Sequence, residues 1–327
     1  MIGAAIIGLG WWGRTIAAAL AESPLIRPVL GIDPDPVARA HLVGIDTDAQ
    51  FERALDDPRV QAVILCTPHR MHGAQIVAAA NAGKHVFCEK PLCTTVEEAD
   101  AAFAAVDHAG VVLGIGHERR FEPAVQELIA EARAGRFGTL LAVEAHFNQD
   151  KFIALPADNW RLSATAAPVG PLSATGIHLV DLSIALLGEP EEVWARLSTR
   201  ATNFANGDTL CITLGFAGGT NATIHAILAT PFAGRLALFG AHGWRAITDR
   251  THPEAPSGWD IVTTWHGGTA SSQFAPAFSG VRANLEAFAT AIAGGGDYPV
   301  TRAEMRANVR AFAAIMRSVQ SGAVEKI

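Results

Sequence analysis

Short apolar runs alternate with helix-prone, Ala-rich segments along the first third of the chain. The apolar runs predict strands at Ala4–Ile7, Pro28–Ile32, Ala62–Cys66, His85–Cys88 and Val111–Ile115. The segments between them predict helices at residues 15–22, 50–55, 72–82 and 95–109, with another beginning at Pro36. Continuous apolar strands that alternate with helices are typical of a parallel sheet covered on both faces. We therefore predict a doubly wound α/β domain of the Rossmann type over residues 1–121.

The pattern changes after Phe121. A helix is predicted over residues 124–134, and strands dominate from Leu140 onward. Over residues 209–216, large apolar residues alternate with small or polar ones, which is typical of a sheet with one buried face. Further strands are predicted at residues 220–228, 235–239 and 261–265, and closing helices at residues 281–293 and 302–321. We expect a second α/β domain over residues 122–327, with a largely antiparallel open sheet.

Composition narrows the function classes. The 327 residues are 50% hydrophobic and 17% charged, which excludes a disordered chain and favours two domains. The net charge of −7 comes without a basic cluster, so a nucleic-acid partner is not expected. Four cysteines without a CxxC pair indicate reduced thiols, and no apolar run is long enough for a membrane helix. We therefore expect a cytoplasmic protein with no membrane partner.

Three glycines follow the first predicted strand in the spacing GxGxxG. Gly8 allows a tight turn, Gly10 lets the backbone approach a pyrophosphate, and Gly13 allows close packing of helix on strand. Asp33 ends the next predicted strand, 33 − 13 = 20 residues further on, as a dinucleotide site requires. Its carboxylate would bind ribose hydroxyls and repel a 2′-phosphate, which favours NAD over NADP. The alternative is a structural glycine turn beside a solvated aspartate.

Several short motifs point to one family. Residues 67–72 follow the pattern Thr-Pro-x-x-x-His, residues 82–86 are Ala-Gly-Lys-His-Val, and residues 89–91 are Glu-Lys-Pro. Residues 119–121 are Arg-Arg-Phe, and residues 176–181 are Gly-Ile-His-Leu-Val-Asp. With the glycine motif, these segments resemble the glucose–fructose oxidoreductase / inositol dehydrogenase / rhizopine-catabolism (Gfo/Idh/MocA) family. The resemblance is specific over residues 4–123 and looser afterwards.

The resemblance implies an NAD-dependent oxidoreductase. It implies a Rossmann domain and a second domain whose open sheet often serves dimerisation, with the nicotinamide between the domains. Lys90 would contact the reacting hydroxyl of a small sugar, polyol or sugar acid, where partial burial and the charge of oxidised nicotinamide would lower its pKa. A surface lysine in a turn is the alternative. We expect a homodimer or homotetramer.

The resemblance also assigns residues in the second domain. His178 matches a family histidine, at the start of a helix that ends before Gly188, and would exchange a proton with the substrate. A satisfied interior histidine is the alternative. Asp181, one turn further on, either orients the imidazole or merely solvates the helix. Ala174 stands where many polyol-oxidising members carry Asp, and Gly170-Pro171 replaces the usual Gly-Gly.

The remaining candidates are cofactor residues, and no metal site is expected because neither His69 with His72 nor His178 with Asp181 has a third ligand. The cofactor candidates are Trp11, Trp12, Thr67, Pro68, His72, Glu89, His117, Trp160 and Arg161. Trp11 and Trp12 would cover the pyrophosphate or pack against the second domain. Two other functions stay open: an enzyme that retains NAD for elimination or glycoside cleavage, and a regulatory NAD(H)-binding protein with a decayed site.

Overall fold

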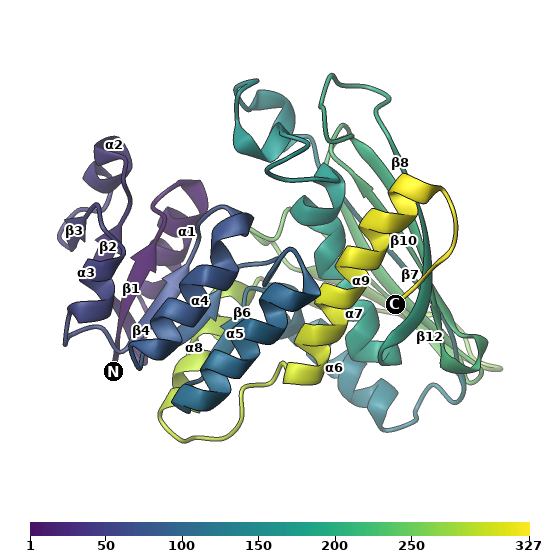
Figure 1. The fold of residues 1–327 in the computed structure, drawn as a ribbon. Helices are drawn as coiled ribbons and strands as arrows, with labels where there is room; N and C mark the ends of the chain where they lie inside the picture. Colours follow the sequence, from purple (N-terminus) through teal and green to yellow (C-terminus); the bar gives the residue numbers. More distant parts are fainter. The chain divides into compact units, whose positions relative to one another are not determined.

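The computed structural model describes residues 1–327, which divide into two compact units (Figure 1). The first unit comprises Met1–Glu118 and Ser279–Met305, and the second comprises Arg119–Phe278 and Arg306–Ile327. The expected ranges of 1–121 and 122–327 differ from these units mainly in the segment Ser279–Met305, which returns to the first unit.

A six-stranded parallel sheet forms the centre of the first unit. Its strands are β1 (Ile2–Ile7), β2 (Ile26–Ile32), β3 (Asp46–Asp48), β4 (Ala62–Leu65), β5 (His85–Cys88) and β6 (Leu113–Ile115). Their order is β3-β2-β1-β4-β5-β6. Since parallel crossovers are right-handed, the order places the connections of β1–β3 and of β4–β6 on opposite faces. The predicted doubly wound sheet is confirmed.

Six α-helices belong to this unit. They are α1 (Trp11–Leu20), α2 (Pro36–Ala40), α3 (Glu52–Asp56), α4 (His72–Asn81), α5 (Val96–Ala109) and α8 (Gly280–Ile292). α4 packs against α5, and α1 packs against α8. α5 shows why its boundaries were predictable from sequence: the Thr95 hydroxyl accepts from the Glu98 N–H at the first turn, and Gly110 ends the helix at φ +64°.

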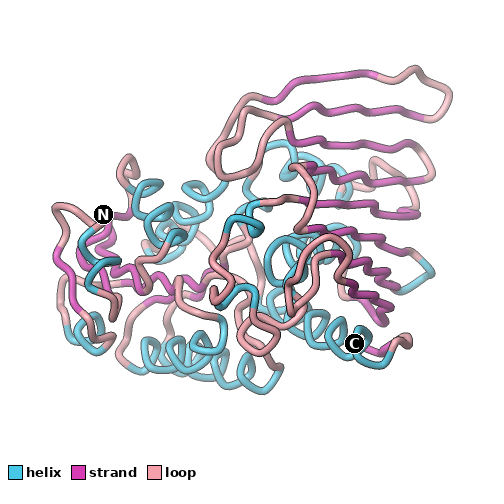
Figure 2. Tube along the Cα trace, turned by 90° about the horizontal axis from the view of Figure 1, so that it is seen from above, coloured by secondary structure: helices cyan, strands magenta, loops and turns pink.

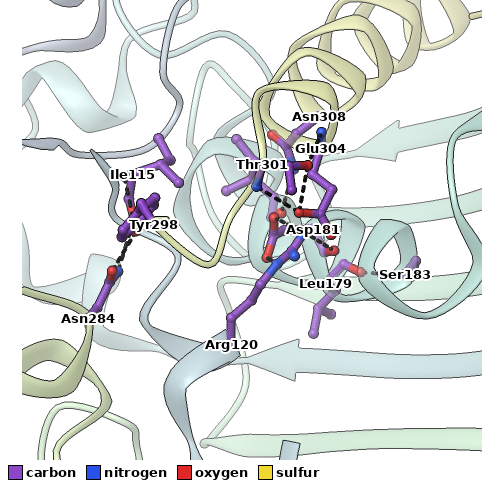
Figure 3. A network of polar contacts seen from close by, with 11 residues as sticks. Ile115, Arg120, Leu179, Asp181, Ser183, Asn284, Tyr298, Thr301, Glu304 and Asn308 are labelled. Atoms are coloured by element: carbon purple, nitrogen blue, oxygen red, sulfur yellow. Dashed lines mark hydrogen bonds and ion pairs between the residues drawn. The ribbon is translucent and has the colours of Figure 1, made fainter. Parts of the chain in front are cut away.

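Hydrogen bonds tie the returning segment to the edge strand β6. The Tyr298 hydroxyl accepts from the Ile115 N–H at 3.2 Å and donates to the Asn284 side-chain oxygen at 2.6 Å (Figure 3). The Asn284 amide nitrogen in turn donates to the Ile115 carbonyl at 2.9 Å. These contacts satisfy an otherwise unpaired strand edge, which is why α8 belongs with the first unit although it is remote in sequence.

A nine-stranded mixed sheet forms the second unit, in the order β14-β13-β12-β11-β7-β10-β9-β8-β15. Its strands are β7 (Leu140–Asn148), β8 (Pro190–Ser198), β9 (Thr209–Phe216), β10 (Asn221–Ile227), β11 (Ala233–Gly240), β12 (Gly243–Asp249), β13 (Trp259–Trp265), β14 (Ser271–Ala275) and β15 (Glu325–Lys326). Only β7 and β10 pair in parallel. The predicted largely antiparallel sheet is confirmed.

The helices of this unit are α6 (Pro123–Arg133), α7 (Ile177–Leu187) and α9 (Arg302–Ser321), whose residues from Arg306 belong here. They lie on one side of the sheet (Figure 2). The core consists of their apolar faces and the inward residues of the strands. In β9, Leu210, Ile212, Leu214 and Phe216 are buried while the residues between them are half-buried, as the alternation predicted. No helix of the chain is both long and apolar enough to cross a bilayer.

Candidate functional site

The glycine loop lies between β1 and α1, and its three glycines differ in their surroundings. At Gly8, where φ is +92°, a Cβ would come within 2.8 Å of the Cys66 carbonyl oxygen. At Gly13 a Cβ would lie 1.9 Å from the Gly8 carbonyl oxygen, whereas at Gly10 it would meet nothing within 4 Å. Two glycines thus permit close backbone packing, and the third leaves open space at the helix N-terminus. This loop fits a dinucleotide pyrophosphate.

Asp33 follows β2 and holds the glycine loop in place. Its carboxylate accepts from the Leu9 N–H at 2.7 Å and from the Asp35 N–H at 2.9 Å. Each carboxylate oxygen keeps a second lone pair for a ribose hydroxyl. The guanidinium of Arg39 donates to the Asp33 carbonyl at 2.6 Å. Arg39 was not predicted from the sequence, because its contact with the Asp33 carbonyl forms only in the folded chain.

Trp11 and Trp12 open helix α1, four residues earlier than the helix was predicted to begin. Their ring centroids are 5.4 Å apart and the rings are tilted by 54°. Trp11 is exposed, while Trp12 is half-buried. The two indoles therefore face different environments, and their contact with a cofactor stays a prediction.

The loop after β4 carries Thr67 and Pro68, and His72 connects it to the loop after β5. His72 is fully buried. Its Nε2 lies 2.9 Å from the Thr67 carbonyl and its Nδ1 lies 2.8 Å from the Pro91 carbonyl. Burial lowers its pKa. Both ring nitrogens face backbone oxygens, so His72 links the two loops, and its contact with a cofactor stays a prediction. The Thr67 hydroxyl donates to Gln75 at 2.6 Å.

Glu89 and Lys90 follow β5 at the same edge of the sheet. Lys90 is half-buried, which argues against a freely solvated surface lysine. The Glu89 side chain is buried, and burial raises its pKa to about 7, although the nearby Trp12 indole and Lys90 favour the charged form. A Cβ at position 116 would lie 2.4 Å from the Glu89 carboxylate, so only a glycine at position 116 leaves room for the Glu89 side chain. His117, next in the chain, is also buried.

In the second unit, His178 lies in the first turn of α7, which ends before Gly188 as predicted. Its ring centroid is 6.2 Å from that of Phe147 on β7, and it is buried. A π-helical turn over Leu172–Gly176 precedes it and carries Ala174. Such turns are frequent at functional sites.

Asp181 is buried and paired. Its carboxylate accepts two hydrogen bonds from the Arg120 guanidinium, at 2.6 and 2.9 Å (Figure 3). The interpretation that Asp181 merely solvates the helix is therefore wrong, because only 1% of the residue is exposed. Orientation of the His178 imidazole by Asp181 stays a prediction.

Arg119 forms a second buried network. Its guanidinium donates to Asp249 at 2.7 and 2.8 Å and to Glu122 at 3.3 Å. The indole N–H of Trp259 donates to the same Asp249 carboxylate at 2.8 Å. The guanidinium also lies 5.4 Å from the centroid of the Phe147 ring. The Arg-Arg-Phe motif thus supplies two buried arginines with separate acid partners.

Trp160 and Arg161 form a short 3-10 turn, Trp160–Leu162. The Arg161 guanidinium lies 4.4 Å from the Trp160 ring centroid, and burial lowers its pKa. The Asn206 amide nitrogen holds this loop by donating to the carbonyls of Arg161 at 2.7 Å and Ala167 at 2.8 Å. Asn206 was not predicted from the sequence, because it lies in a loop 45 residues from Arg161 with no motif around it.

Comparison with protein families gives two matches. Residues 2–117 match the NAD-binding Rossmann-fold model of the Gfo/Idh/MocA oxidoreductase family, and residues 124–245 match the C-terminal domain of that family. The chain belongs to the Gfo/Idh/MocA family. The resemblance stated from the motifs is confirmed, and the first unit is an NAD-binding Rossmann fold.

Curated Gfo/Idh/MocA relatives include sugar dehydrogenases. Levoglucosan dehydrogenase of Pseudarthrobacter phenanthrenivorans is 32% identical over 208 residues, covering 59% of this chain and 53% of that protein. The chain thus spans about half the length of this relative. D-xylose 1-dehydrogenase (NADP(+)) 2 of Haloferax volcanii is 29% identical over 294 residues, covering 89% of this chain and 88% of that protein.

A solved structure matches over the whole chain. The aldose-aldose oxidoreductase of Caulobacter crescentus, complexed with glycerol, has a TM-score of 0.87 and 28% sequence identity. The match covers 100% of this chain and 99% of that one. The likeness in fold therefore extends over both units of the chain.

Proposed function

We propose that this chain is a dehydrogenase that interconverts a carbinol and a carbonyl in a small polyhydroxylated substrate, such as a sugar, polyol or sugar acid. The observation that carries the proposal lies within the first unit. The glycine loop, Asp33, Thr67 and Lys90 all follow the carboxyl ends of strands in one parallel sheet, where open α/β sheets bind ligands. Lys90 is the group there with a transferable proton on a half-buried amine.

In this proposal, separate residues bind the cofactor and transfer the proton. Gly8, Gly10, Gly13 and Asp33 bind NAD, which when bound accepts the hydride that leaves the carbinol carbon. The neutral amine of Lys90 takes the hydroxyl proton during oxidation, and its ammonium returns a proton to the oxygen during reduction. His178 is the proposed second proton-exchanging group.

The proposal extends to the substrate class, the residues that contact the cofactor, and the location and oligomeric state. The substrate class is supported by relatives that act on levoglucosan and D-xylose. Further residues are proposed to contact the cofactor: Trp11, Trp12, Thr67, Pro68, His72, Glu89, His117, Trp160 and Arg161. We also propose that the protein is cytoplasmic and that it forms a homodimer or homotetramer. Light scattering during gel filtration measures this oligomeric state directly.

The test is absorbance at 340 nm with NAD+ and a panel of sugars, inositols and sugar acids. We expect Lys90→Ala to lower kcat by about 100-fold or more on any oxidised substrate, the scale of a lost proton-transfer group. Calorimetric titration should show unchanged NAD+ binding. Lys326→Ala, which removes an exposed lysine paired with Glu192, is the control. Full activity in Lys90→Ala, or silence of the wild type across the panel, would refute the proposal.

A further inference from the structure

A cluster of four polar side chains in the second unit has no part in the proposed chemistry. Gln149 and Lys151 follow strand β7, and His252 and Glu254 lie in the loop between β12 and β13. The Lys151 ammonium pairs with the Glu254 carboxylate at 2.5 Å and lies 3.2 Å from His252 Nδ1. His252 Nε2 lies 2.9 Å from the Gln149 side-chain oxygen.

The surroundings of His252 fix its tautomer. Two donors point at Nδ1, namely the Lys151 ammonium at 3.2 Å and the backbone N–H of Glu254 at 3.3 Å. The nearest Glu254 oxygen is 3.6 Å from Nδ1, beyond hydrogen-bond distance. A proton on Nδ1 would face both donors, so Nδ1 is the acceptor and Nε2 carries the hydrogen.

This tautomer in turn fixes the amide of Gln149. An N–H at His252 Nε2 requires an acceptor, so the Gln149 carbonyl oxygen, and not its nitrogen, faces the ring. Gln149 is 6% exposed, and its amide nitrogen has no hydrogen-bond partner in the structure. The amide nitrogen of Gln149 is also not fully enclosed by protein atoms, so it reaches accessible space. A mostly buried amide thus offers two N–H donors in a fixed direction.

Phe147 places this amide in the same region of the unit as His178. The Phe147 ring centroid lies 6.2 Å from that of His178 and 5.5 Å from that of His252. The two histidines therefore pack against one phenyl ring. Gln149 is two residues beyond Phe147, so both residues project to the side of the sheet that α7 covers.

We propose that the Gln149 amide N–H donates a hydrogen bond to a hydroxyl oxygen of the substrate and that His252, held by Lys151, positions it. The inference rests on the proposed function and adds a specificity-determining residue to it. An unpaired, oriented donor discriminates by affinity: a substrate with oxygen at that point satisfies it, and an analogue that lacks the oxygen leaves it unsatisfied.

The experiment combines the removal of the Gln149 amide with the removal of single hydroxyl groups from the substrate. Kinetics on D-glucose, D-xylose, levoglucosan and myo-inositol, and on their monodeoxy analogues, are measured for the wild type and Gln149→Met. For the wild type we expect one deoxy position to lower kcat/KM by about tenfold or more, mainly through KM. In Gln149→Met we expect kcat/KM for the parent substrate to fall by a similar factor, and kcat/KM for that deoxy analogue to stay at its wild-type value. A purely structural role of Gln149 would weaken parent and analogue alike, and would overturn the inference.

His252 is a positioning residue in this scheme and needs its own variants. His252→Phe keeps the packing on Phe147 and removes the donor, so it should raise KM for the same substrate without lowering kcat. His252→Gln keeps an N–H at the position of Nε2 and should restore KM. Equal effects of the two variants would contradict a positioning role.

Calorimetric binding of the same polyols to the NADH complex separates this inference from the proposed function. Binding that weakens in Gln149→Met supports the inference even where no oxidation is seen. Oxidation with unchanged kinetics in Gln149→Met refutes the inference and leaves the dehydrogenase intact. If no polyol binds the wild type, Gln149 does not recognise a polyol hydroxyl and the inference fails.

Discussion

The candidate sites of the two units hold their polar groups in different ways. Around the site of the first unit the partners are backbone atoms: N–H groups hold Asp33, and carbonyls face His72. Around the site of the second unit, buried arginines pair with acidic side chains, as in Arg119 with Asp249 and Arg120 with Asp181. The first site therefore depends on backbone shape, whereas the second depends on keeping both members of each ion pair.

The largest effect is expected from breaking a buried pair in the second unit. Asp181→Ala leaves the Arg120 guanidinium buried without its carboxylate, which typically costs about 3–5 kcal/mol. We expect urea denaturation, followed by tryptophan fluorescence and far-UV circular dichroism, to show a loss of this size.

The matched control is Asp260→Ala, because Arg250 and Asp260 also form a two-oxygen ion pair but are about half exposed. Water replaces the lost partner there, so the unfolding midpoint should stay close to that of the wild type. Equal losses in the two variants would show that burial does not distinguish these pairs.

The second effect concerns Glu89, a buried acid in the first unit with no ion-pair partner of the kind seen in the second. Burial raises its pKa from 4.5 to about 7, so the folded chain binds this proton more tightly than the unfolded chain. The stabilising contribution is complete below pH 4.5 and is lost as the pH rises to 7. A rise of the pKa from 4.5 to about 7 corresponds to roughly 3 kcal/mol.

Glu89→Gln isolates this contribution from other titrations. We expect the free energy of unfolding of the wild type, minus that of Glu89→Gln, to fall by about 2–3 kcal/mol between pH 5 and pH 8. Denaturation of both proteins at several pH values measures the difference. A constant difference would mean that Glu89 stays ionised in the folded chain.

Strands with a clear apolar pattern were predictable from sequence, and strands with polar composition were not. β1 and β4 are continuous apolar runs, and β9 alternates strictly, whereas the parallel edge strand β3 is the polar segment Asp46–Asp48. β8 begins Pro190-Glu191-Glu192, β14 is mostly exposed, and β12 buries Arg245 in place of an apolar residue. Their pairing partners, and not their own sequences, make these segments strands. The return of residues 279–305 to β6 likewise depends on long-range hydrogen bonds.

The candidate site likewise contains residues that were predictable from sequence and residues that were not. The glycine loop with Asp33 was predictable, because each glycine answers a local backbone requirement and the spacing is fixed by one βαβ unit. Arg39, Asn206 and His252 were not, because each acts through a contact that forms only in the folded chain. The pairing of Asp181 with Arg120 spans 61 positions, beyond the reach of any helical spacing rule.

The smallest effects come from adding one methyl group to the backbone-shaped surface of the first unit. In Gly13→Ala the Cβ would lie 1.9 Å from the Gly8 carbonyl oxygen, a backbone atom that cannot move cheaply. We expect a loss of about 1–3 kcal/mol of stability. In Gly10→Ala the Cβ meets nothing within 4 Å, so the unfolding midpoint without ligand should barely change.

Gly10→Ala should instead weaken NAD+ binding by about tenfold or more, because the methyl group fills the space through which the pyrophosphate approaches the helix N-terminus. Calorimetric titration of NAD+ and thermal denaturation of the free protein, run on both variants, separate the two roles. If Gly10→Ala binds NAD+ as tightly as the wild type, the open space at Gly10 does not receive the cofactor. The glycine loop would then be a packing element alone, and backbone shape would serve the fold of the first unit without serving its ligand.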